Sequence, residues 1–384
     1  MAVLCVILRN RILISYSGAE SYGYLNLIVS YSPILVAIAS FGLRSTALRI
    51  FQSENWRGHF VSLRVILLLT TFVVSICWRL ISDVDSTLVY ASVLGHSLFL
   101  SFQTLYSALF QKLNKQFMIP VYQLFWALGS IIIVLALKDH SNLVEYVIII
   151  PSFGVLLFTT FYVNTLFLRS PVSLNAFLSL FKVLIKELRL AASVIASTII
   201  TAFILFRIRY VIAHDSHTSL AFFSALYTFT HIIPNFLFSG ITNFIYPVFL
   251  RQNLKEGKSV IRLFRENVKY LVLFLIVGIL AGLIVLNCMG FALEQMFGAS
   301  FIFLETFSGL VACTILVRLF ATYIGLFVTV EGNYLKTFII ELFPNTALLG
   351  YVILYPGVDS YAVAICLSAI IHIILTIVLL KRES

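Results

Sequence analysis

Long apolar runs separated by short polar turns make up most of this chain. A backbone in hydrocarbon must satisfy its own hydrogen bonds, and about 20 apolar residues in a helix cross a bilayer. The pattern therefore predicts an all-α polytopic membrane protein with eleven full spans, at residues 22–43, 60–81, 87–110, 117–137, 143–168, 190–213, 219–250, 270–289, 301–330, 337–355 and 361–380.

The segment before the first full span is apolar but too short to cross a membrane. Residues 1–8 are followed by a polar stretch with Arg9, Arg11 and Ser17-Gly18-Ala19-Glu20, which we interpret as a turn. We therefore expect a first helix that is truncated, and a bundle of 11 to 12 helices.

Composition supports a membrane protein. It also gives the positive charge of the chain a cause other than nucleic-acid binding. The 384 residues are 61% hydrophobic and 11% charged, and the mean hydropathy is +1.04. A net charge of +10 in a soluble protein would indicate nucleic-acid binding. Here the Lys and Arg residues concentrate in alternate loops, as the positive-inside rule requires. We expect no nucleic-acid partner and a cytoplasmic C-terminus.

One basic amphipathic stretch divides the chain. Residues 169–189 carry Arg169, Lys182, Lys186 and Arg189 between apolar residues at helical spacing. Such a helix is expected to lie on the inner membrane face, among membrane lipids. The predicted organisation is an N-terminal lobe at 1–168, a cytoplasmic linker at 169–189 and a C-terminal lobe at 190–384.

The two lobes repeat each other weakly. Pro33 and Pro234 lie in the middle of corresponding spans, each after an acidic residue and before a glycine and an arginine. An even number of spans separates the copies, so both run in the same sense. Transporters with such parallel repeats rock two halves around a central cavity. We interpret Pro33 and Pro234 as candidate gating kinks.

The order of several short motifs resembles the Wzx-type polysaccharide flippases. These belong to the multidrug/oligosaccharidyl-lipid/polysaccharide exporter superfamily. The matching residues are Arg11, Gly18–Tyr24, Phe41-Gly42-Leu43, Arg49, Tyr246-Pro247, Phe297-Gly298, Glu331-Gly332-Asn333, Lys336 and Tyr361–Ala364. The resemblance implies two six-helix lobes and alternating access. It also implies transfer of an undecaprenyl-pyrophosphate-linked oligosaccharide to the outer leaflet, for a polysaccharide polymerase and its chain-length machinery.

Arginines within or beside the spans are the candidate substrate-binding residues. Arg318 stands inside a span, where a charge is expensive and faces a wet cavity or a partner such as Glu305. Guanidinium groups pair well with phosphate. The candidates are Arg318, Arg207, Arg209 and Arg79, with Arg49, Arg251 and Arg265 as inner-face residues that recruit the headgroup. The alternative for Arg79 is that it anchors its helix at the membrane interface. The alternative for Arg49, Arg251 and Arg265 is that they only set the topology of the chain.

Proton coupling and other functions have weaker signals. His96 and His231 lie in spans and are candidate coupling residues. We see no clear mid-span Asp or Glu, which argues against a carboxylate-centred cation exporter. That exporter remains the alternative function. A membrane-embedded glycosyltransferase or polymerase is less favoured, since Asp83-Val84-Asp85 lies in a short turn. We expect no enzyme activity, no cofactor and no metal.

Overall fold

The computed structural model describes residues 2–40, 50–51, 56–81, 86–113, 115, 118–167, 180, 196, 198–232, 234, 266–331 and 334–381. Of the predicted amphipathic linker only Leu180 is described, and it is buried. Three of the predicted inner-face residues, Arg49, Arg251 and Arg265, lie outside the described residues, as does the Asp83–Asp85 turn.

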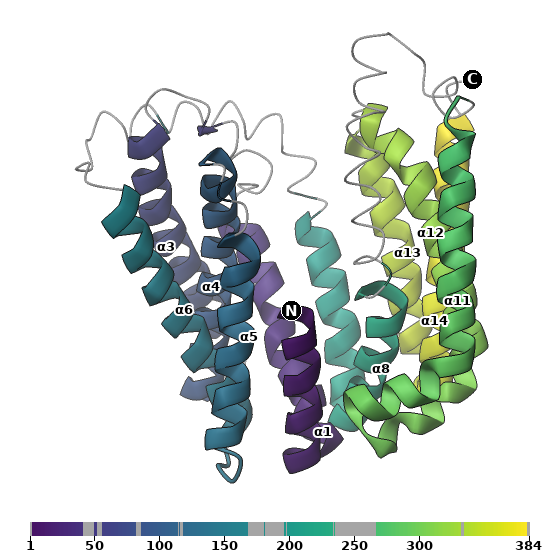
Figure 1. Cartoon of the computed structure of the whole chain (residues 1–384), viewed down its shortest axis with the longest axis horizontal. Helices are drawn as coiled ribbons and strands as arrows, with labels where there is room; N and C mark the ends of the chain where they lie inside the picture. Colours follow the sequence, from purple (N-terminus) through teal and green to yellow (C-terminus); the bar gives the residue numbers. More distant parts are fainter. Residues whose placement is uncertain are drawn as a thin grey trace. The chain divides into compact units, whose positions relative to one another are not determined.

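Every regular element in the described ranges is a helix, and the chain forms two units (Figure 1). Unit 1 covers Met1–Phe206 and unit 2 covers Arg207–Ser384, so the boundary lies within helical residues 198–215. Eight of the described helices are long and apolar enough to cross a membrane, and Phe338–Leu354 is a shorter apolar helix. The predicted all-α polytopic fold is confirmed.

Unit 1 packs its helices around α4. The elements are α1 (Ala2–Ala39), α3 (Trp56–Ile81), α4 (Thr87–Lys112), α5 (Met118–Ala136) and α6 (Leu143–Phe167). Helix α4 contacts all four of the others. Small residues on its buried faces, such as Ser97 and Ser101, let neighbouring backbones come close, which is how helices pack where lipid replaces water. Ser86 caps the start of α4 by accepting a hydrogen bond from the Val89 backbone N–H.

Helix α1 corrects one expectation about the N-terminal region. The stretch around Arg9 and Arg11 is helical rather than a turn, and α1 runs from residue 2 to residue 39. The helix is broken at Gly18, which has φ 79° and ψ 172°. Pro33 sits within the helical part and is exposed. Only glycine adopts this backbone region readily, so Gly18 sets the break.

We expect Gly18→Ala to destabilise the protein by about 1–3 kcal/mol, the usual cost of a forbidden backbone conformation. An added Cβ at Gly18 has no atom within 4 Å, so crowding does not contribute. Gly154 is the matched control, because its Cβ position is equally open and it lies inside α6. Gly154→Ala should be neutral or stabilising by about 0.5–1 kcal/mol. Reversible denaturation in detergent measures both; equal effects would contradict the prediction.

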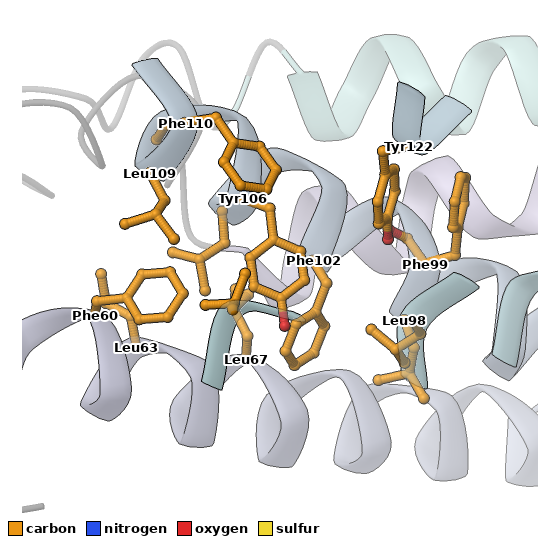
Figure 2. Close-up of a cluster of buried hydrophobic side chains, with 14 of the residues drawn as sticks. Phe60, Leu63, Leu67, Leu98, Phe99, Phe102, Tyr106, Leu109, Phe110 and Tyr122 are labelled. Carbon is orange, nitrogen blue, oxygen red and sulfur yellow. The ribbon is translucent and has the colours of Figure 1, made fainter. Parts of the chain in front are cut away.

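Aromatic and branched side chains fill the core of unit 1 (Figure 2). The Phe60 ring of α3 lies 5.8 Å from Phe51 and 6.0 Å from Tyr106, between ring centroids. The hydroxyl of Tyr106 shares a hydrogen bond of 2.8 Å with Thr160 Oγ1. In the same cluster, Tyr122 stacks on Phe99 at 4.9 Å. These contacts hold α3, α4, α5 and α6 together as one packed body.

Unit 2 is organised around a different central helix, α12. Its elements are α8 (His217–Tyr227), η1 (Thr228–Ile232), α11 (Val268–Phe297), η2 (Ala299–Phe307), α12 (Ser308–Glu331), α13 (Tyr334–Leu354) and α14 (Val358–Lys381). Helix α12 contacts α11, α13, α14 and η1. Gly278 and Gly282 of α11 face α12, and a Cβ at Gly278 would lie 2.7 Å from a Leu319 methyl. The two helices are closest at Gly278, because a Cβ at Gly282 would make only an ordinary contact with Ala312 at 3.7 Å.

Candidate functional site

Arg318 lies in the middle of α12, inside the helix bundle of unit 2. Its Nε is enclosed and has no hydrogen-bond partner among the described residues. The guanidinium is within electrostatic range of Tyr227 and Glu341, and also of His231 and His372. The alternative partner Glu305 lies elsewhere, since its carboxylate occupies the space where a Cβ of Gly290 would be. Arg318 thus brings a cation with unused donor capacity into an apolar bundle.

Tyr227 and His231 form a stacked pair at the end of α8. Their ring centroids are 3.8 Å apart and the rings are inclined by 15°. The helix changes to a π-helix over Thr228–Ile232, which brings residues 227 and 231 onto one face. Pro234 follows closely; it is helical and buried. A proline crowds the carbonyl four residues earlier, and a wider π turn relieves that crowding, which explains the change of helix type.

The His231 ring has a defined hydrogen-bond role. Thr230 Oγ1 donates to the Leu226 carbonyl at 2.8 Å and lies 3.1 Å from His231 Nδ1. A hydroxyl has one proton, so Nδ1–H of the imidazole donates to Oγ1. The neutral ring therefore keeps Nε2 as its acceptor. The sequence identified His231 as a candidate residue, but it did not indicate that Tyr227 stacks on it.

Arg207 and Arg209 diverge, as residues two apart on a helix do. Arg207 is exposed and its guanidinium carbon lies 5.4 Å from the centroid of the Tyr210 ring. Arg209 is partly buried and lies 5.8 Å from the centroid of the Tyr227 ring. The structure therefore brings Arg209, Tyr227, His231 and Arg318 into one neighbourhood and leaves Arg207 outside it.

Two further predicted site residues lie in unit 1. Arg79 is exposed in the last turn of α3, with its guanidinium carbon 4.8 Å from the centroid of the Tyr90 ring. His96 is buried in α4, and its ring lies 5.9 Å from Phe99 and 5.5 Å from Trp126, between ring centroids.

Two acidic residues near the ends of predicted spans lie in apolar helices. Glu341 is the eighth residue of α13 and lies within electrostatic range of Arg318. Glu145 is buried in the first turn of α6, and its Oε1 accepts a hydrogen bond of 3.1 Å from the Tyr24 hydroxyl. Both residues lie inside apolar runs of the sequence, so each could have been noticed as a carboxylate in a span. Neither was singled out, because each lies near the end of a predicted span.

Solved structures with the same fold are transporters. A multidrug resistance MATE family transporter of the MOP superfamily, in an inward-facing conformation, matches with a TM-score of 0.75 at 12% identity, over 99% of this chain and 94% of that one. A MOP superfamily transporter from Pyrococcus furiosus matches at 0.58 and 13% identity, over 100% and 95%. A eukaryotic MATE transporter matches at 0.56 and 12% identity, over 99% and 90%. In the Pyrococcus furiosus transporter, the reverse polarity of the binding pocket suggests a different function.

No family model matches the chain, and no curated protein matches it. At 11–13% identity the structural likeness establishes the fold alone. The chain therefore has a MATE-like fold of helix bundles and is a multi-pass membrane protein.

Proposed function

We propose that this chain moves a lipid-linked oligosaccharide with a pyrophosphate headgroup across a bacterial inner membrane by alternating access. The observation that carries the proposal is Arg318. It places a guanidinium inside an apolar bundle, and its enclosed Nε has no partner among the described residues. An enclosed donor of a cation that lacks a hydrogen-bond partner is costly, and an anionic ligand offsets that cost. Pyrophosphate oxygens match the planar donors of arginine.

The neighbours of Arg318 fit the same ligand. Arg209 adds a second cation beside Tyr227, and the Tyr227–His231 stack offers flat rings of the kind that pack on sugars. In this mechanism the two arginines hold the headgroup while the apolar tail stays in lipid. No covalent step is involved, so the protein's work is binding and a change of conformation. His231, with Nε2 as acceptor, is the candidate group for proton coupling in this unit.

The competing function is an ion-coupled exporter of small cations, and one observation favours it. Glu341 and Glu145 are carboxylates inside apolar helices, and a cation exporter uses such groups. The structural neighbours include multidrug resistance transporters, which point the same way. We favour the anionic substrate because Arg318, Arg209 and Arg9 outnumber these acids within the apolar helices.

Lipid analysis of a strain that lacks the gene separates the two functions. For the flippase we expect loss of surface polysaccharide and accumulation of single undecaprenyl-pyrophosphate-linked repeat units in the inner leaflet. For the exporter we expect normal polysaccharide and greater sensitivity to cationic drugs. Repeat units found on the outer leaflet but not polymerised would overturn the proposal, because a polymerase would then be the missing activity.

A further inference from the structure

Unit 1 contains a buried arginine that the proposed site does not use. Arg9 lies in the first part of α1, and only 6% of its surface is exposed. No carboxylate pairs with it in the described part of the chain; its side-chain contacts there are an amide and an aromatic ring. A charge inside an apolar bundle costs several kcal/mol unless it is paired, so its presence needs a reason.

The contacts of Arg9 leave one end of the guanidinium unused. Its Nε and Nη2 both donate to Asn10 Oδ1, at 3.0 and 2.6 Å. Its guanidinium carbon lies 5.3 Å from the centroid of the Trp126 ring. Nη1 is enclosed and has no hydrogen-bond partner within the described ranges. The amide fixes the orientation of the group and the ring supports its face, so the free edge is held in place.

A second enclosed nitrogen lies against the same tryptophan. The His96 ring is 5.5 Å from Trp126, between centroids, and its Nδ1 has no hydrogen-bond partner in the part of the chain that the structure describes. Arg9 and His96 are within electrostatic range of each other. Trp126 is itself held, because its Nε1 donates to Ser152 Oγ at 3.1 Å. Three helices, α1, α4 and α5, therefore bring two unsatisfied nitrogens to one rigid indole.

We propose that Arg9 and His96 bind an oxyanion of the phosphate class in unit 1. Only an anion supplies both the counter-charge that Arg9 lacks and the oxygen acceptors that Nη1 and a protonated Nδ1 need. A cation would be repelled, and a neutral ligand would leave the charge uncompensated. The inference deepens the proposed function, on which it rests, by adding a phosphate-binding contact within unit 1.

The enclosure of Nη1 has a mechanistic consequence. An anion reaches it only when the packing of α1 against α4 and α5 opens. Binding at Arg9 is therefore tied to a movement of α1, whose break at Gly18 supplies a joint in the same helix. A ligand that binds only the opened form shifts the population towards that form.

The test is a titration of the purified full chain in uncharged-lipid nanodiscs with inorganic pyrophosphate, read by the fluorescence of Trp126. Trp56→Phe and Trp78→Phe remove the other two of the three tryptophans. We expect a saturable change in Trp126 emission, and Arg9→Gln should weaken it by roughly tenfold or more, as loss of a charged hydrogen bond does. Arg11→Gln is the control, two residues away on α1, and should leave binding unchanged.

A variant that keeps the positive charge of residue 9 distinguishes loss of binding from loss of folding. Arg9→Lys retains the buried cation but loses the planar fork, so it should fold and bind pyrophosphate more weakly than the parent. Equal affinity of the parent, Arg9→Gln and Arg9→Lys would overturn the proposal, as would the absence of any response in the parent. The lipid analysis reads accumulation in cells and this titration reads binding, so the two proposals can fail separately.

Discussion

Arg318→Glu is expected to abolish transport while the protein still inserts into the membrane. The change replaces the cation of α12 with an anion in the same enclosed place, so a pyrophosphate headgroup would meet repulsion where it now meets a donor. Removing one partner of a desolvated charge pair costs about 2–5 kcal/mol of binding, and reversal adds to that. Arginine and glutamate are both expensive inside a span, so the cost of insertion changes little.

The control for this variant is Arg207→Glu. Arg207 carries the same charge but is exposed and rests on Tyr210. Restoration of surface polysaccharide in the gene-deletion strain measures transport, and membrane fractionation measures insertion. We expect Arg207→Glu to restore polysaccharide and Arg318→Glu to fail. If Arg318→Glu restored it fully, Arg318 would not contact the substrate.

The sequence predicted the helical architecture because the bilayer leaves few choices. Apolar runs near 20 residues must form helices, so helices such as α3, α4, α5 and α6 could be placed from length alone. The error at α1 has a physical cause. Arg9 and Arg11 suggested a turn, but a helix carries charges into a bundle when the side chains find an amide and a ring, as Arg9 does. Periodicity does not reveal such partners.

The candidate site was predictable one residue at a time but not as a group. Arg318 stood out because a charge inside an apolar run is rare. Its neighbours could not be foreseen, since His231 and Glu341 come from different helices that meet only in the folded unit. At Gly18 the sequence indicated a turn between the apolar stub and the first span, whereas the structure shows a break at this glycine inside α1, with φ of 79°.

The core of unit 1 should depend on Phe60 far more than on a lipid-facing phenylalanine of the same helix. Phe60 is 0% exposed and contacts Phe51 and Tyr106, whereas Phe72 is 49% exposed. We expect Phe60→Ala to lower the free energy of unfolding by about 3 kcal/mol. This is the low end for a buried phenylalanine, because an unfolded state that stays in hydrocarbon recovers part of the transfer energy.

Phe72→Ala makes the comparison decisive, because it removes the same atoms from the same helix. Phe72 faces lipid, so its truncation removes few contacts with the rest of the protein. The free energy of unfolding of this variant should therefore lie within about 0.5 kcal/mol of that of the parent. Unfolding in mixed micelles with increasing denaturing detergent measures both. Equal losses would mean that residues 60 and 72 are buried alike, and that α3 does not present one face to the core and the other to lipid. A large loss at Phe60 alone would locate the stabilising energy of this unit in the contacts of α3 with α4, the helix that all the others pack against.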